Sequence, residues 1–388
     1  MLLVAYAAFV GLGLPDAVTG VAWPSIRGAF GLDQGGLGLV LSAAAAGYLA
    51  SSLAAGGLVA RFGVGGLLAG SSAAVAVALL GYAATGSWPV LLLCAVALGA
   101  GGGAIDAALN LFVATAFGPR QLNWLHASYG VGAALGPLLM TAALAADRGW
   151  RWGYGAIAAV LAALALLYFA TRRMWSVQSS GAGRGGDERA AAQGAWGALR
   201  TPAVPRHVAA FFLLAGMEAT AGQWSYTVLT EARGVGAAAA GFCVGGFWAL
   251  FTLGRVAAGF AVPRFGSVRL ARGAAFGALA GASLFAFSPA SALPVGVAGL
   301  WLAGFALGPL FPGLMAETPR RVGAGAAAHA VGFQVGAAVV GMAALPALAG
   351  ALAERFGLGA APAVLVCAGL AFLALHEWIA AAPSAADG

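Results

Sequence analysis

Residues 89–117 read PVLLLCAVALGAGGGAIDAALNLFVATAF and contain one charged side chain, Asp106. A run this long exceeds the roughly 18 residues that mark a membrane-spanning helix, and it lacks the alternation of a barrel strand. Backbone groups in lipid find no water to bond, so such a run is predicted to be helical. The whole chain of 388 residues has the same apolar character, since it is 62% hydrophobic and only 8% charged.

Eleven further apolar runs lie between charged or Pro/Gly-rich breaks. The sequence therefore predicts an all-α membrane protein with twelve transmembrane helices in two six-helix bundles. The expected helices are 2–25, 35–60, 66–86, 89–117, 123–145, 152–171, 206–229, 237–262, 268–288, 294–316, 326–350 and 359–381. A polar stretch predicts a linker at 172–205, between an N-terminal bundle (1–171) and a C-terminal bundle (206–388). No basic residue precedes the first run, so we expect a retained span and not a signal peptide.

Arginine placement predicts the orientation, because loops on the cytoplasmic side are enriched in basic residues. All nineteen basic residues are arginine. With the N-terminus inside, the inner loops hold thirteen of them and the outer loops five. We therefore expect a multi-pass protein of the cell inner membrane with both termini in the cytoplasm. The net charge of +7 then faces anionic lipid and not nucleic acid, and we expect a monomer in the bilayer.

A similar turn recurs four times along the chain, and this is the most informative pattern. The four copies are Arg61-Phe62-Gly63, Asp147-Arg148-Gly149-Trp150, Arg264-Phe265-Gly266 and Arg355-Phe356-Gly357. Their arginines are 87, 116 and 91 residues apart, and the longest interval contains the linker. The chain is thus predicted to contain four copies of a three-helix unit, a repeat plan typical of secondary transporters.

Three acidic residues lie near the middle of predicted spans: Asp16, Asp106 and Glu218. They precede the arginine of their own repeat by 45, 42 and 46 residues, so they occupy one place in three units. In the fourth unit that place is taken by residues 309–313, which read PLFPG. A carboxylate at mid-membrane must face water, find a partner or take up a proton, and burial favours the protonated form. The pattern predicts proton coupling with solute recognition in one central cavity, against the alternative of buried structural acids.

Amide and indole side chains gather at comparable depth on the same helices. Amides hydrogen-bond hydroxyl groups and indole faces cover C–H surfaces, which suits a small polar solute such as a sugar. Each aromatic taken alone fits packing or lipid contact equally well. The predicted solute-binding residues are Asn110, Gln223, Trp224, Trp248 and Gln334.

Six residues are predicted to act in gating. Pro309 and Pro312 lack backbone donors and predict a break in the tenth helix, which would give it flexibility. Arg255 either extends to the membrane interface or pairs with Glu317 and helps to close the cytoplasmic side. Two turn arginines, Arg61 and Arg264, complete the set.

The chain resembles the major facilitator superfamily over its whole length, and within it the branch that includes fucose and glucose proton symporters. The resemblance rests on Gly101-Gly102-Gly103-Ala104-Ile105-Asp106 with Asn110, Leu122-Asn123-Trp124-Leu125-His126-Ala127, Glu218 with Trp224, and Phe247-Trp248 followed by Gly254-Arg255. It implies that Asp16 and Asp106 handle sugar and protons. The superfamily's signature after the second helix is present in part, as Gly57, Arg61 and Gly63 without its aspartate.

Two other functions are also compatible with parts of this pattern. Proton-driven export of an amphipathic compound would need the same acids with a larger, more apolar cavity. A membrane-embedded enzyme is disfavoured, because the sequence has no H-E-x-x-H, no G-x-S-x-G and no phosphate loop. The three cysteines lie in apolar runs without metal-ligand spacing, so we expect neither a metal nor a cofactor. The solute and the choice between symport and antiport stay undetermined.

Overall fold

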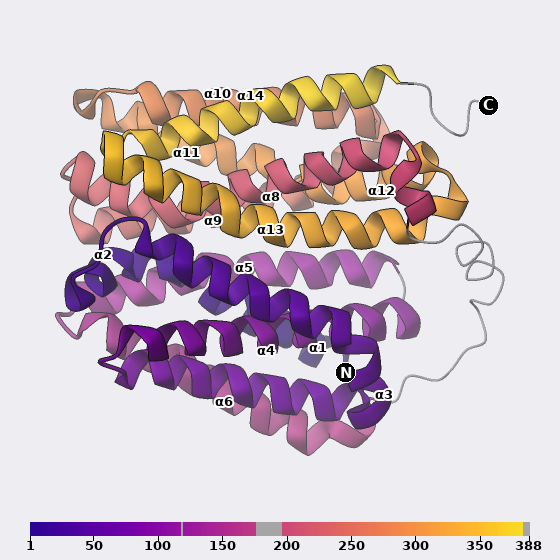
Figure 1. Cartoon of the computed structure of the whole chain (residues 1–388), viewed down its shortest axis with the longest axis horizontal. Helices are drawn as coiled ribbons and strands as arrows, with labels where there is room; N and C mark the ends of the chain where they lie inside the picture. Colours follow the sequence, from indigo (N-terminus) through magenta and orange to yellow (C-terminus); the bar gives the residue numbers. More distant parts are fainter. Residues whose placement is uncertain (118, 176–195, 383–388) are drawn as a thin grey trace. The chain divides into compact units, whose positions relative to one another are not determined.

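The computed structural model describes residues 1–117, 119–175 and 196–382, and every element defined within them is a helix (Figure 1). Most of the predicted linker therefore lies outside the described residues. The elements are α1 (Leu2–Asp16), α2 (Val18–Phe30), α3 (Gly36–Ala84), α4 (Trp88–Ala116), α5 (Pro119–Ala145), α6 (Gly149–Thr171), η1 (Arg172–Met174), α8 (Ala203–Thr227), η2 (Val228–Ala232), α9 (Ala237–Phe265), α10 (Ser267–Phe287), η3 (Ala290–Ala292), α11 (Leu293–Leu307), α12 (Leu310–Val322), α13 (Ala324–Phe356) and α14 (Ala360–Ala381).

Ten of the described segments are long and apolar enough to cross a membrane. One of them is α3, whose 49 residues leave the helical conformation at Gly63 and so contain two spans. The helix α8 is not among the ten, and it supplies the remaining span with its 25 residues. The predicted total of twelve helices is therefore confirmed, although the second and third are joined without a loop.

Two of the predicted spans are interrupted. The first, expected as one helix over 2–25, ends as α1 at Asp16 and starts again as α2 at Val18. This break was not predicted, although Pro15 removes a backbone donor just before it. The second lies in the tenth span, where α11 ends at Leu307 and α12 begins at Leu310. Here the helical hydrogen bonding stops at the predicted proline pair, while Gly308 and Pro309 keep right-handed helical φ and ψ.

The four repeated turns share a backbone conformation. Their glycines all have positive φ, at 68° for Gly63, 76° for Gly149, 77° for Gly266 and 87° for Gly357. Only glycine adopts such φ values without steric strain, which explains why it recurs at this place. The recurrence read from the sequence is therefore a recurrence of structure.

The chain divides into two compact units, which we call the first and second unit. The first unit comprises Met1–Ser179, Gly222–Ala249 and Gly350–Leu358, and the second comprises Ser180–Ala221, Leu250–Ala349 and Gly359–Gly388. Within the first unit α3 packs against α4 and α6, and α1 packs against α5 (Figure 1). Within the second unit α10 packs against α11 and α14. The predicted domain boundaries at 171 and 205 stay a prediction.

Candidate functional site

Asp16 lies at the end of α1, directly before the break in the first span. Its side chain is exposed, although the residues before and after it are buried. The Tyr129 hydroxyl of α5 donates a hydrogen bond to Asp16 Oδ2 at 2.9 Å. The backbone carbonyl of Asp16 accepts a second bond at 2.9 Å, from the side-chain amide of Gln223. The break thus presents a carboxylate to water while its backbone acceptor stays satisfied.

Asp106 lies within α4 and is half-buried. The Tyr48 hydroxyl of α3 donates to Asp106 Oδ2 at 2.7 Å. Asn110, one helical turn further along, donates its side-chain amide to Asp106 Oδ1 at 2.9 Å. Both carboxylate oxygens are therefore bonded by neutral donors, which leaves Asp106 free of any fixed positive partner among these contacts.

Asp16 and Asp106 are each positioned with the help of a glycine three residues earlier. Gly13 precedes Asp16 by three residues, and a side chain at Gly13 would overlap the backbone oxygen of Tyr129. Gly103 precedes Asp106 by three residues, and a side chain there would contact the backbone oxygen of Tyr48. In both cases glycine lets two helices touch through their backbones. The close approach places the tyrosine of one helix beside the acid of the other.

Asp16 lines the same small cavity as Ile105, the residue directly before Asp106 in α4. The Tyr48 hydroxyl interacts electrostatically with the carboxylates of Asp16 and Asp106, and it donates a hydrogen bond to that of Asp106. We refer to Asp16, Tyr129, Asp106, Tyr48 and Asn110 together as the acid pair site.

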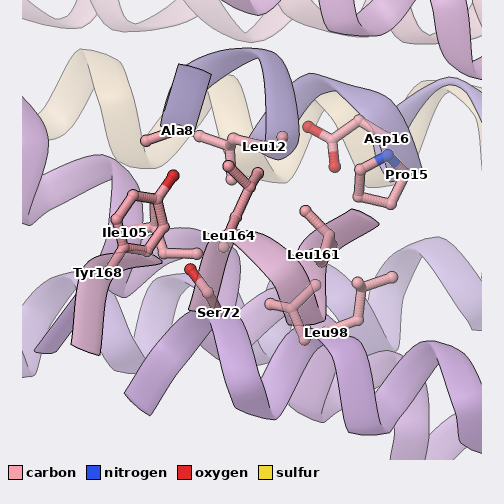
Figure 2. A pocket seen from close by; sticks show the side chains of 13 residues that line it. Ala8, Leu12, Pro15, Asp16, Ser72, Leu98, Ile105, Leu161, Leu164 and Tyr168 are labelled. Atoms are coloured by element: carbon pink, nitrogen blue, oxygen red, sulfur yellow. The ribbon is translucent and has the colours of Figure 1, made fainter. Parts of the chain in front are cut away.

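A small cavity adjoins the acid pair site (Figure 2). Its volume is about 20 Å³, which is space for roughly one water molecule. Most of its walls are apolar, and Asp16, Ser72 and Tyr168 are the lining residues that carry a polar side chain. The Tyr168 side chain is 1% exposed, and its hydroxyl has no hydrogen-bond partner among the described residues. The cavity therefore offers a water molecule polar contacts next to Asp16.

The predicted solute-binding residues are placed differently from one another. Asn110 and Gln223 bond the two acids themselves, so the structure brings these amides to the acid pair site. Trp224 and Trp248 are almost fully buried, with 2% and 4% of their surface exposed. Gln334 of α13 is fully buried and donates to the hydroxyl of Thr318 in α12 at 2.9 Å. These last three residues are held in packed surroundings.

The third acid, Glu218, is half-buried on the part of α8 that belongs to the second unit. Asp16 and Asp106 belong to the first unit. That all three line one cavity therefore stays a prediction.

The predicted gating residues lie at turns and at the second break. Arg61 and Arg264 are exposed beside the turn glycines. Glu317 of α12 accepts a hydrogen bond from the Ser267 hydroxyl at 2.6 Å. Arg255 donates from Nε to the backbone oxygen of Gly308 at 3.2 Å, so its pairing with Glu317 stays a prediction.

Sequence reasoning missed the two tyrosines of the acid pair site. Tyr48 is 58 residues from Asp106, and Tyr129 is 113 residues from Asp16. A signal was present, because a tyrosine inside an apolar span needs a partner for its hydroxyl. The partner could not be identified without knowing which helices pack together.

A family model described as Major Facilitator Superfamily matches residues 5–337. Among curated proteins, Bypass of stop codon protein 6 of Saccharomyces cerevisiae is 25% identical over an alignment of 334 residues. That alignment covers 76% of this chain and 64% of the yeast protein. The chain thus spans less than two thirds of that relative's length.

Several solved structures are similar in fold. A bacterial homologue of the human lysosomal transporter Spinster has a TM-score of 0.79 at 14% identity, covering 98% of this chain and 96% of its own. The nucleoside transporter NupG has a TM-score of 0.74 at 14% identity, covering 98% and 97%. The E. coli fucose:proton symporter FucP has a TM-score of 0.62 at 17% identity, covering 97% and 98%. At these identities the similarity shows the fold alone.

Proposed function

The chain belongs to the Major Facilitator Superfamily, and on this premise we propose that it takes up a small polar solute, such as a sugar, together with protons. Family and fold are those of secondary transporters working by alternating access, and not of enzymes. The proposal places the protein in the inner membrane as a monomer, with both termini in the cytoplasm.

The observation that carries the proposal is the exposed carboxylate of Asp16 at a broken helix, beside the half-buried carboxylate of Asp106. An acid that reaches water from inside a span can exchange protons with the solution. A proton taken up by either carboxylate removes a charge from a membrane span, where a charge is costly. Because the bonds to the acids come from tyrosine and amide donors, protonation leaves no unpaired positive charge behind.

The donors around the acids also suit a hydroxylated solute. Phenol and amide groups can exchange their bond to a carboxylate for a bond to a solute hydroxyl. The proposed contacts are Asn110, Gln223, Trp224, Trp248 and Gln334, with Tyr48 and Tyr129 added from the structure. Two proteins of similar fold are named a fucose:proton symporter and a nucleoside transporter, which supports a polar solute.

Glu218 and the gating set complete the proposal. Glu218 would be the second unit's proton-binding group. Residues Arg61, Arg255, Arg264, Pro309, Pro312 and Glu317 would control the closing of the pathway.

The test is uptake by the purified full chain in proteoliposomes, using labelled monosaccharides and nucleosides. An inside-alkaline pH gradient should drive accumulation of at least one solute above its external concentration, and a protonophore should abolish that accumulation. The matched control is D33N, which removes an exposed loop carboxylate. Saturable uptake that is the same with and without the pH gradient would overturn proton coupling.

Export of an amphipathic compound is the second candidate, and the mainly apolar lining of the cavity beside Asp16 favours it. The same vesicles distinguish the two functions. For an exporter, the inside-acidic gradient should drive accumulation of a lipophilic cation or dye, while the sugars and nucleosides give no signal.

A further inference from the structure

The break between α11 and α12 leaves two backbone carbonyls without their helical donors. In an α-helix each carbonyl accepts from the amide four residues later. Pro309 and Pro312 have no amide hydrogen, so the oxygens of Phe305 and Gly308 lose those bonds. The neighbouring bonds remain: Gly308 N donates to Gly304 O at 3.2 Å, and Gly313 N donates to Pro309 O at 3.1 Å. The helical hydrogen bonding is thus interrupted at two defined acceptors.

Two adjacent residues of α9 contact these two carbonyl oxygens. Arg255 Nε donates to the Gly308 oxygen at 3.2 Å. Gly254 lies against the Phe305 oxygen so closely that any side chain at 254 would overlap it. A side chain at Gly308 would likewise overlap the backbone oxygen of Phe251. The α9 backbone and the break are therefore in direct contact, and glycine is required on both sides.

The guanidinium of Arg255 makes a second contact besides its hydrogen bond to Gly308. It lies 4.5 Å from the centroid of the Phe251 ring, one turn earlier on α9. The side chain is half-buried. Because Nε is the guanidinium nitrogen nearest the backbone, a bond made by Nε leaves the stem little freedom. The guanidinium also keeps its charge at all relevant pH values.

We propose that Arg255 is a positioning residue that replaces the missing amide of Pro312 and so stabilises the break between α11 and α12. Its role is to keep the two half-helices at a defined hinge that the transport cycle can use. The inference rests on the proposed transport function for its purpose. The contact itself is tested by stability, which needs no solute.

The test is a double-mutant cycle on the full chain in lipid nanodiscs. Arg255→Met keeps the length of the side chain and removes the donor, and it should lower Tm by about 2–4 °C. Pro312→Ala returns an amide four residues after Gly308. In the Pro312→Ala background, the Tm loss caused by Arg255→Met should therefore fall by half or more.

Pro309→Ala is the matched control, because its new amide would serve the Phe305 oxygen and not that of Gly308. It should leave the cost of Arg255→Met unchanged. An equal cost of Arg255→Met in all three backgrounds would overturn the inference and assign the residue's effect to its charge or its ring contact. If Arg255→Met alone does not fold, recovery of folded protein with Pro312→Ala but not with Pro309→Ala supports the inference, and failure with both overturns it.

A second readout separates positioning from stability alone. At a temperature well below its Tm, Arg255→Met should transport about tenfold more slowly with KM unchanged, since the hinge and not the solute site is altered. Arg255→Gln keeps N–H donors without the charge, so it should restore most of the rate. Unchanged transport in folded Arg255→Met would restrict the residue to a structural role and overturn the positioning role.

Discussion

The two broken spans can be compared directly, because they occupy one place in the first and fourth repeat units. The first break lies at Ala17 and the second at Gly308 and Pro309. At each, a backbone oxygen accepts a hydrogen bond from another helix's side chain. Gln223 donates to Asp16 O at 2.9 Å, and Arg255 donates to Gly308 O at 3.2 Å. Interrupted helices are tolerated in a membrane when such partners satisfy the freed groups.

The difference lies in what else each break carries. The first has an exposed carboxylate, Asp16, and a neutral amide partner. The second has two prolines, no acid, and a permanently charged partner in Arg255. A carboxylate changes its charge with pH and a guanidinium does not. Under the proposed function, the first break would bind the coupled proton and the second would only bend.

The largest effect is expected from removing the carboxylate of the first break, Asp16. Asp16→Asn should reduce pH-driven accumulation by about 100-fold or more, because an amide cannot take up the coupled proton. Solute exchange across the membrane without a gradient should persist, since the backbone contacts at the break remain. Uptake and counterflow in the same proteoliposomes measure both quantities. D33N serves as the control, and accumulation by Asp16→Asn at the parent level would remove the residue from coupling.

The next effect concerns the prolines of the second break. Pro309→Ala with Pro312→Ala should straighten the tenth span and slow transport about tenfold, while the protein still folds, because both missing amides return. Pro319→Ala, also in α12 but past the break, is the control. Transport rate and Tm should be measured on the same preparations. A double variant that transports at the parent rate would show that the break has no function.

The sequence predicted the second break and missed the first for a physical reason. Two prolines three residues apart disrupt a helix wherever it packs. A single proline, such as Pro15, can stay within a helix when neighbouring groups satisfy the freed acceptor. At Ala17 the interruption depends on contacts with other segments, among them Gly20 against the backbone of Gln223. Such contacts cannot be read from local sequence.

In the acid pair site too, contacts within one helix can be read from the sequence, whereas contacts between helices cannot. Asn110 contacts Asp106 from one helical turn away, a spacing that is visible in the sequence. The tyrosines Tyr48 and Tyr129 were missed because they come from other helices. The glycines three residues before each acid were visible, but their role depends on which backbone they touch. Composition and repeats therefore predicted the fold, whereas the acid pair site needed the packing.

A smaller effect should distinguish the pH responses of the two breaks. Tyr129→Phe removes a hydrogen bond that favours the ionised form of Asp16, so the acid should hold its proton to higher pH. The pH of half-maximal uptake should move upward by about one unit. Arg255→Gln, at the second break, should leave this pH unchanged. Equal shifts in both variants would contradict the division into a proton-sensing and a bending break.

The smallest effect is expected from the neutral partner of the first break. Gln223 bonds the Asp16 carbonyl beside an exposed side chain, so water can replace part of what the amide provides. Gln223→Leu should therefore lower the transport rate by only about threefold, with Tm nearly unchanged. Gln223→Glu places a second carboxylate at this break, and it should not add to the proton coupling that Asp16 provides. Arg255→Met at the second break should be the costlier change in both rate and Tm. Side-by-side measurement in nanodiscs and proteoliposomes ranks the two, and a larger loss for Gln223→Leu would mean that the first break depends on its partner as strictly as the second.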